Sequence, residues 1–300
     1  MKAETPLQAA GATGGEEGAL LRLSSRRPSR FWYRYRQGRL AVVGACMLAL
    51  IVLMALAAPL LAPGDPGYID LASREKPPSL QHLFGTDRLG RDVFARIVWG
   101  ARVSLGVSLL AVSLGSLIGV LLGAIAGYTG GPTDVVITRA IDVMLSLPTF
   151  FLLVTIQSLF PPSALNVIVI IGITSWMAIA RIVRGQFLSM KQRDFVEAAR
   201  CLGAQPARVI FLHILPNVSS QIIVYFTLGL ADAVLVESAL SFLGLGVPPY
   251  QASWGNMLID GQIGILSGLW WVAFFPGLMI LLTALSINFV GDGLQESLFK

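Results

Sequence analysis

Long apolar stretches alternate with short polar segments along the chain from about residue 40 to its end. A helix that crosses a hydrocarbon core of roughly 30 Å needs about 20 mostly apolar residues. By this measure the pattern predicts six membrane-spanning helices, at residues 40–62, 102–127, 135–159, 164–183, 218–245 and 269–291. An even number of spans places both ends of the chain on the same side of the membrane. The predicted fold class is therefore an all-α membrane protein.

Small and helix-breaking residues inside the predicted spans indicate how the helices pack. The second span has a glycine at every fourth position: Gly115, Gly119, Gly123 and Gly127. Residues four apart share one helix face, so another helix can approach this face closely. Packing within the chain is favoured over a dimerisation motif. Pro148 and Pro276 lack a backbone donor, and we expect the third and sixth spans to kink or open locally there.

Composition supports the same fold class and excludes a water-soluble protein. Hydrophobic residues make up 55% of the 300-residue chain and charged residues only 13%, with a mean hydropathy of +0.72. Soluble domains carry roughly 25% charged residues. The two cysteines, Cys46 and Cys201, show no metal-site spacing, so we expect both to be free thiols.

The region before the first span divides into two segments. Residues 1–29 are rich in Gly, Ala, Ser and Glu without a helical or strand period, and we expect a disordered cytoplasmic tail. Residues 30–39 interleave arginines with aromatic side chains. Such a segment fits the membrane interface, because aromatic rings sit at headgroup depth and arginines face anionic lipid. Lipid contact is favoured over nucleic-acid binding, and the arginines place the N-terminus in the cytoplasm.

The basic residues of the loops agree with this orientation in two places and conflict with it in a third. Segment 181–208, expected in the cytoplasm, carries six Lys or Arg residues, and segment 246–268, expected outside, carries none. Segment 63–102 is also expected outside, yet it carries six, against the positive-inside rule. We give more weight to the N-terminal arginines and to segment 181–208, and expect both termini in the cytoplasm.

Three carboxylates fall within the predicted spans: Asp142, Asp232 and Glu237. A charge in hydrocarbon costs roughly 2.5–3.5 kcal/mol even on the insertion scale, so each side chain should face a cavity or a partner. Lining a hydrated translocation path or capping a helix contact is favoured over a dedicated proton site, because no Lys, Arg or His accompanies Asp232 and Glu237 in sequence.

The chain shows no pattern for chemistry of its own. It lacks the GxxxxGK[ST] loop that cradles ATP phosphates. Its two histidines, His82 and His213, are far apart and have no neighbouring cysteine cluster, which argues against a zinc site. A serine nucleophile elbow is also missing. We therefore expect neither an enzyme nor a directly bound metal or cofactor.

One polar insert, residues 184–216, interrupts the apolar pattern between the fourth and fifth spans. It predicts two short amphipathic helices, at 186–202 and 206–215, separated by a turn at Gly203–Pro206. Such a helical pair is too polar to span and could lie on lipid or dock on a protein. Its small central residues favour protein docking.

The sequence of this insert resembles a known motif. Residues 197–217, EAARCLGAQPARVIFLHILPN, resemble the EAA loop of the membrane subunits of ABC importers. The matching positions are Glu197, Ala198, Ala199, Gly203, Leu215 and Pro216. Four further stretches resemble the dipeptide/oligopeptide/nickel permease family, and its second permease subunit in particular: residues 85–105, 237–249, 253–258 and 288–298. Local departures at Ala95, Cys201 and Leu212 alter no role.

The resemblance implies a six-helix permease domain over residues 40–300 with a cytoplasmic coupling helix in the EAA loop. The docking surface for the ATPase would comprise Glu197, Ala198, Ala199, Gly203, Pro206, Leu215 and Pro216. Implied partners are a sister permease subunit, two cytosolic ATPase subunits that use ATP and Mg²⁺, and an extracytoplasmic solute-binding protein. The expected location is the cytoplasmic membrane of a prokaryote.

The cargo implied by the resemblance is a dipeptide or oligopeptide, with nickel or another small solute as the alternative. An ion-coupled secondary carrier is the alternative from a different class. Such a carrier would show inverted repeats and a charged site at mid-membrane depth, and neither pattern is evident in the sequence.

Overall fold

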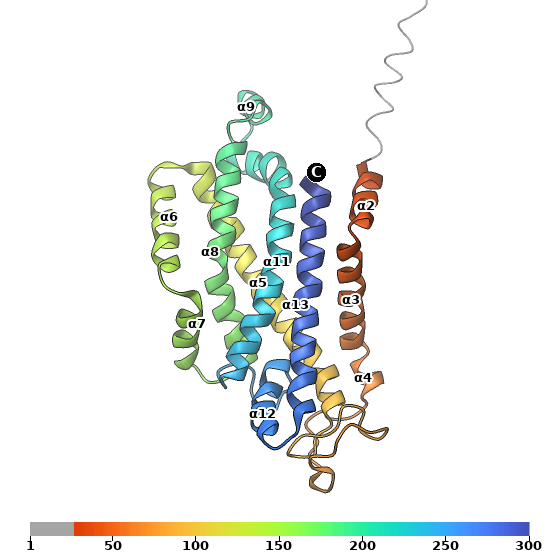
Figure 1. The fold of residues 1–300 in the computed structure, drawn as a ribbon. Helices are drawn as coiled ribbons and strands as arrows, with labels where there is room; N and C mark the ends of the chain where they lie inside the picture. Colours follow the sequence, from red (N-terminus) through yellow and green to blue (C-terminus); the bar gives the residue numbers. More distant parts are fainter. Residues whose placement is uncertain (1–26, 300) are drawn as a thin grey trace, which may run out of the picture.

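The structure is a computed structural model that describes residues 27–299, with side chains described from Trp32 onward. Over this range the chain is helical, and its extended pairing is limited to one isolated bridge between Thr86 and Asp92. The long helices stand side by side in a single bundle (Figure 1). The all-α fold class is therefore confirmed.

Five helices are long and apolar enough to cross a membrane, and the number rises to six if one bent helix pair counts as a single span. The five are α3 (Arg39–Leu56), α5 (Val93–Thr129), α8 (Ala164–Met190), α11 (Leu215–Phe242) and α13 (Trp270–Phe299). The bent pair is α6 (Gly131–Leu145) with α7 (Thr149–Ser158). Shorter elements are α2 (Arg27–Gln37), α4 (Ala58–Leu61), η1 (Leu71–Ser73), α9 (Asp194–Cys201), α10 (Pro206–Arg208), η2 (Val209–Ile214) and α12 (Trp254–Leu266).

The third span is not the single helix predicted over 135–159. Helices α6 and α7 meet at an angle of 84°. Pro148 occupies the N-cap of α7 with ψ 114°, and a proline disfavours helical backbone at the residue before it. The expected effect of Pro148 is therefore larger than a kink. In α13, by contrast, the helix continues without a break through Pro276.

Several span ends differ from their predicted limits because polar residues extend the helices beyond the apolar stretch. Helix α5 begins at Val93 rather than 102, and the side chain of Asp92 caps it by accepting a hydrogen bond from Ala95 N at 2.9 Å. Helix α8 ends at Met190 rather than 183, since Phe187 is fully buried in the core. Helix α13 runs to Phe299 rather than 291.

The N-terminal segments also differ in part from expectation. Residues 1–26 of the predicted tail lie outside the described residues, while 27–29 begin helix α2 rather than continuing a disordered tail. Most of the segment predicted at the interface, 30–39, belongs to the same helix. Tyr35 is buried and donates a hydrogen bond from its hydroxyl to Ala41 O at 3.2 Å, which ties α2 to the start of α3.

The glycines of α5 form a close contact with α8. A Cβ atom on Gly119, Gly123 or Gly127 would lie 2.7, 2.5 and 2.7 Å from the carbonyl oxygens of Trp176, Ala180 and Arg184, respectively. Gly115 faces Gly172 in the same way, one turn further along. The two backbones therefore approach so closely that this face of α5 has no room for side chains.

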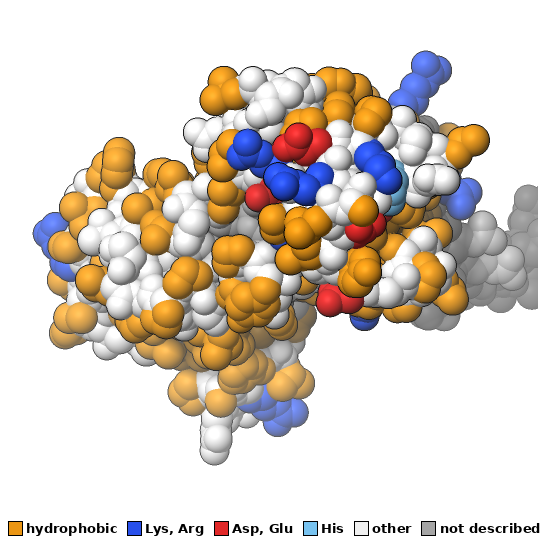
Figure 2. Space-filling view, turned by 90° about the horizontal axis from the view of Figure 1, so that it is seen from below, with side chains coloured by type: hydrophobic (Ala, Val, Ile, Leu, Met, Phe, Trp, Pro, Cys, Tyr) orange, Lys and Arg blue, Asp and Glu red, His pale blue; other side chains and the backbone are white. Residues whose placement is uncertain are grey.

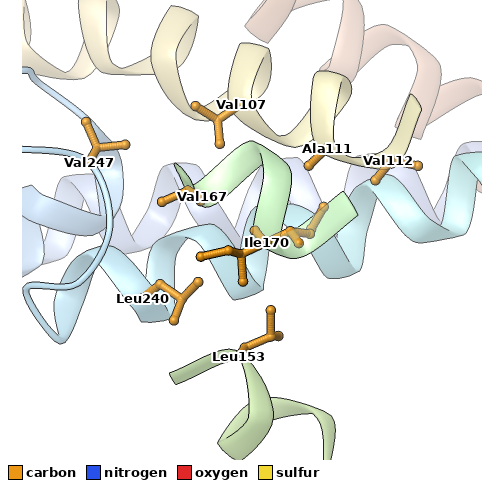
Figure 3. Close-up of a cluster of buried hydrophobic side chains, with 10 residues drawn as sticks. Val107, Ala111, Val112, Leu153, Val167, Ile170, Leu240 and Val247 are labelled. Atoms are coloured by element: carbon orange, nitrogen blue, oxygen red, sulfur yellow. The ribbon is translucent and has the colours of Figure 1, made fainter. Parts of the chain in front are cut away.

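The largest apolar core lies where α5, α7, α8 and α11 meet. Figure 3 shows Val107, Ala111 and Val112 of α5 facing Val167 and Ile170 of α8, with Leu153 of α7 and Leu240 of α11 closing the cluster. All seven are buried. The buried cluster fixes α7 against the bundle even though the chain bends sharply before it.

The bundle has two ends of different construction. Helix α9, helix α2 and the C-terminus lie at one end, and α12 and residues 63–92 lie at the other (Figure 1). We call these the α9 end and the α12 end. Seen from the α12 end, the charged side chains gather over one part of the surface, whereas most of the rest is hydrophobic or uncharged (Figure 2).

Candidate docking helix and translocation path

The polar insert contains one separate helix, not two. Residues 186–190 belong to α8, the chain turns at Lys191–Arg193, and α9 occupies Asp194–Cys201. Residues 206–215, predicted as a second insert helix, are continuous with α11 in a helix from Pro206 to Phe242. The prediction of a separate second helix is wrong because residues 209–218 carry buried apolar side chains that continue the stripe of the span.

Helix α9 has one face that is buried and another that is open. Val196 packs into a core cluster shared with the ends of α5, α8 and α11, and Ala199 is also buried. Arg200 lies over the ring of Tyr128, 5.3 Å from its centroid, a cation–π contact that adds to this anchoring. Glu197 and Ala198 are exposed on the other face. Helix α9 is thus seated on the bundle and still presents an accessible surface.

The turn after α9 has the geometry of a Schellman motif. Gly203 N donates to Arg200 O at 2.9 Å and Ala204 N donates to Ala199 O at 3.0 Å. Gly203 has a φ of +82°, a left-handed conformation that glycine adopts without strain. No atom lies within 4 Å of the place where a Cβ atom would be added. The chain itself therefore leaves the space beside Gly203 open.

The remaining residues proposed from the motif occupy the helix that follows this turn. Pro206 is exposed in the first turn of α10, where its missing N–H costs nothing. Leu215 is partly buried and Pro216 is exposed at the start of α11. A π-helical turn, η2, directly precedes them, at the point where Pro216 cannot donate to the helical carbonyl of Leu212. These prolines shape the exit from the turn.

Two acidic residues near the α9 end are paired across helices. Asp142 of α6 accepts a hydrogen bond from Arg181 Nη2 at 2.8 Å, with both side chains about half exposed. Asp134 of α6 accepts two hydrogen bonds from Arg184, one of them from Nη2 at 2.7 Å. Both pairs join α6 to α8. The carboxylate at Asp142 is therefore charge-compensated within the chain.

Asp232 lines a cavity of about 670 Å³ between α7, α8 and α11. Side chains of Val112, Leu153, Ile171 and Ala233 belong both to the cavity wall and to the apolar core. Asp232 has no hydrogen bond or ion pair to any residue between 27 and 299. Neither Asp142 nor Glu237 lines this cavity with Asp232.

Glu237 is fully buried and does not line that cavity. Ser241 Oγ donates to its Oε1 at 2.9 Å and Ser238 Oγ lies 3.5 Å from Oε2. The hydroxyls of Ser104 and Ser253 also lie close to the same carboxyl group. Four serines from α5, α11 and the N-cap of α12 therefore surround one carboxylate.

Three of these hydroxyls are oriented by backbone groups. Each accepts a backbone N–H: Ser104 from Trp254, Ser241 from Val247 and Ser253 from Asn256. Their own protons are then free to be donated to Glu237. Glu237 therefore links α5, α11 and α12 inside the bundle. Sequence patterns alone could not reveal this link, because Ser104 lies far from Glu237 in the chain.

Sequence reasoning also missed a buried ion-pair network at the α12 end. Asp87 Oδ2 contacts Arg91 Nε at 2.6 Å and Arg96 Nη1 at 2.7 Å, and both arginines reach Asp260 Oδ2, at 2.6 and 2.8 Å. Asp87 and Arg96 are buried. The i,i+4 spacing of Asp87 and Arg91 was a visible signal, but Asp260 lies in α12, which the sequence analysis treated as loop.

At the same end, the turn that contains η1 is held by hydrogen bonds between residues that are close in sequence. The Asp70 carboxylate caps η1 by accepting a hydrogen bond from Ala72 N at 3.0 Å. Hydrogen bonding from Ser73 and from this N–H lowers the pKa of Asp70 below its ordinary value. Trp271 Nε1 donates a hydrogen bond to Thr86 O at 3.1 Å, which attaches segment 63–92 to α13. The α12 end is thus held by many interactions within the chain.

Comparison with known proteins identifies this arrangement. Residues 119–300 match the family model described as the binding-protein-dependent transport system inner membrane component. The chain belongs to this family of transport permeases. Residues 29–78 of the permease match a second model, the N-terminal TM domain of oligopeptide transport permease C. The family relationship predicted from the EAA-like segment and its four companion stretches is confirmed.

Relatives of this permease cover nearly all of it. The dipeptide transport system permease protein DppC of Bacillus subtilis (strain 168) is 43% identical over 267 residues, 89% of this chain and 83% of the relative. The oligopeptide transport system permease protein OppC of the same organism is 42% identical over 265 residues, 88% of this chain and 87% of the relative.

Solved structures support the fold. An inward-facing structure of the MetNI methionine ABC transporter has a chain similar to this permease, with a TM-score of 0.54 at 20% identity, covering 65% of this permease and 92% of that chain. At this identity the likeness concerns the fold alone. The ABC-importer permease fold is therefore shown by both sequence and structure.

Proposed function

We propose that this permease is a pore-forming subunit of an ATP-driven importer that carries dipeptides or oligopeptides across the cytoplasmic membrane of a prokaryote. The cargo class follows from the two relatives that transport dipeptides and oligopeptides and match the permease over almost its whole length. The energy would come from ATP and Mg²⁺ used by two separate ATPase subunits, coupled to this chain through α9. The observation that carries the coupling role is the open surface of α9 and Gly203.

The exposed residues of α9 and its turn form the proposed docking surface. Val196 anchors the helix in the core, so a force applied to the exposed face would be transmitted to α5, α8 and α11. Leu202 is 89% exposed at the tip, next to the open space beside Gly203. A large apolar side chain beside an unfilled space suits a partner protein better than water. Glu197 supplies a polar contact at the edge.

The orientation of the permease follows from the same assignment. With α9 in the cytoplasm, α2 and the C-terminus lie on the cytoplasmic side and α12 on the outside (Figure 1). The basic residues of segment 63–102 then need an explanation other than orientation. Arg91 and Arg96 have one, because they compensate Asp87 and Asp260 in the buried network. These charges are part of the fold, and the α12 end would receive the solute-binding protein.

A sister permease is expected to cover the exposed side of α6 and α7. Large apolar side chains stand open along these two helices, among them Val136, Val143, Phe150 and Phe151. A half-exposed ion pair joins Asp142 of α6 to Arg181 of α8. A second, homologous subunit on this face would enclose a path between the two chains and bring this ion pair beside it.

A matched pair of glycine substitutions tests the coupling role. Gly268 ends α12 in the same Schellman geometry as Gly203, with a φ of +81° and equally open space. Asparagine tolerates this backbone conformation. We expect Gly203→Asn to weaken co-purification of the ATPase subunits strongly and Gly268→Asn to leave it near the wild-type level. Equal retention of these subunits by both variants would contradict docking at Gly203.

Cargo and energy source are tested separately in reconstituted vesicles. The complete complex should accumulate a labelled dipeptide when ATP is supplied, and this permease alone should not. Uptake of nickel in place of the dipeptide would favour the alternative cargo. Uptake by the isolated permease driven by a proton or sodium gradient would instead identify an ion-coupled carrier.

A further inference from the structure

The cavity around Asp232 has the size and lining of a binding site for a small organic molecule. Its volume, about 670 Å³, falls within the roughly 300–1,000 Å³ typical of ligand pockets. Along α11, the lining residues follow one helical stripe: Tyr225, Leu228, Gly229, Asp232, Leu235 and Val236. The opposite wall comes from α7 and α8. Most of the surface is apolar, and among the lining residues Asp232 is the single carboxylate.

Asp232 differs from Asp134, Asp142 and Glu237 in having no hydrogen-bond or ion-pair partner within residues 27–299. Asp142 is paired with Arg181, Asp134 with Arg184, and Glu237 is surrounded by serine hydroxyls. A carboxylate at membrane depth is costly unless a cation or hydrogen-bond donors compensate it. Asp232 is exposed in the cavity, so its uncompensated charge is open to a positively charged group that comes from outside the chain.

Threonine and serine hydroxyls share the cavity wall with Asp232. Thr174 Oγ1 donates its proton to Ile170 O at 2.8 Å, which leaves its lone pairs available to a ligand. Thr174 lines the cavity together with Thr149 and Ser175. An acceptor-rich site with one negative charge suits a ligand that donates several hydrogen bonds.

We propose that this cavity binds the N-terminal ammonium group of the cargo peptide, with Asp232 as its counter-ion. The proposal rests on the peptide-import function argued above and names the group of the cargo that the pore recognises. A primary ammonium offers three donors, which fit one carboxylate and neighbouring hydroxyl acceptors. The apolar wall accommodates the first side chain. A hydrated divalent metal fits less well, because it needs several oxygen ligands and Asp232 is a lone carboxylate.

A cysteine reporter makes binding measurable in the assembled transporter. Ala178 lines the cavity and is exposed, so Ala178→Cys places a thiol at the site in a Cys46→Ser, Cys201→Ser background. The rate of alkylation by N-ethylmaleimide is measured without the binding protein. Two probes are compared, leucyl-alanine amide and its N-acetyl form, which differ in the ammonium group. A wild-type Asp232, Asp232→Asn and Asp232→Glu series completes the design.

The proposal predicts protection by the free-amine probe and little protection by the acetylated one. Asp232→Asn should raise the concentration for half-protection at least about tenfold, since a charge-assisted hydrogen bond is lost. Asp232→Glu should retain most of the protection. Equal protection by both probes, or none by either, would overturn the proposal.

Two further readouts separate this inference from its premises. If Asp232→Asn prevents assembly with the sister permease while Asp232→Glu does not, then Asp232 pairs with that subunit, which would also overturn the proposal. Dipeptide uptake by the unmodified complex is measured in parallel. Uptake without ammonium-dependent protection defeats the inference alone, whereas absence of uptake defeats the proposed function.

Discussion

The two ends of this permease are built in opposite ways. The α12 end is held together by a buried network of Asp87, Arg91, Arg96 and Asp260 and by the serine-surrounded Glu237. The α9 end is held by apolar contacts of Val196, by Arg200 over Tyr128 and by partly exposed ion pairs between α6 and α8. The α12 end thus has charged groups paired in its interior, whereas the ion pairs of the α9 end are partly exposed and the outer face of α9 is open.

The two ends differ in where a partner protein can bind. A Schellman turn closes a helix at both ends of the molecule, with Gly203 after α9 and Gly268 after α12. The local geometry is the same, so the turn by itself does not mark a docking site. The distinction comes from what surrounds it: α12 carries Asp260 into the buried network, whereas α9 has no buried charged side chain.

The largest expected effect comes from breaking the network at the α12 end. Asp87→Asn removes a buried charge from two arginines and should destabilise the permease by about 3–5 kcal/mol, because an unpaired buried charge is left behind. Thermal unfolding in detergent measures the effect. Glu75→Gln is the control, since Glu75 and Arg88 are about 40% exposed and 3.8 Å apart, and such pairs contribute at most about 1 kcal/mol. Similar melting temperatures for both variants would show that the network does not hold this end.

A smaller and local effect is expected at the α9 end. Val196→Ala removes two buried methyl groups and should loosen α9 by roughly 1–2 kcal/mol. Hydrogen exchange of the α9 amides should become faster, while the exchange of α12 amides stays the same. Faster exchange throughout the bundle would mean that α9 is part of the global core rather than a separately seated element.

The smallest effect on stability is expected from two exposed leucines. Leu202 at the tip of α9 and Leu266 at the end of α12 are 89% and 90% exposed, so replacing either by serine should leave the melting temperature within about 1 °C. Their functions should differ. Leu202→Ser is expected to weaken co-purification of the ATPase subunits, and Leu266→Ser is not. The comparison of the two ends fails if both variants retain these subunits equally.

The sequence was sufficient for the fold class and for most spans because hydrophobic periodicity is a local signal. It failed at 135–159, where Pro148 turns a single predicted helix into a bent pair. It also failed at 206–215, where apolar residues look amphipathic in isolation but continue into α11. Both errors concern how neighbouring segments join, which depends on packing against the other helices.

The candidate site was predictable only in part. The EAA-like motif located α9 and Gly203 correctly in the chain, since the motif is contiguous. Pairings such as Arg96 with Asp260 or Ser104 with Glu237 join residues more than 100 positions apart, and no local pattern contains them. Helix α12 could have been found from the capping box of Ser253 and Asn256.

The most direct test of the docking surface uses the native thiol of Cys201, which is exposed at the end of α9. In a Cys46→Ser background, maleimide labelling of Cys201 is compared in the isolated permease and in the complex with its ATPase subunits. Ser267→Cys, introduced in a background without the native cysteines, gives the matched site at the α12 end. Labelling of Cys201 should fall at least about tenfold on assembly while labelling at position 267 stays constant. Equal labelling of Cys201 in both states would contradict ATPase docking on α9.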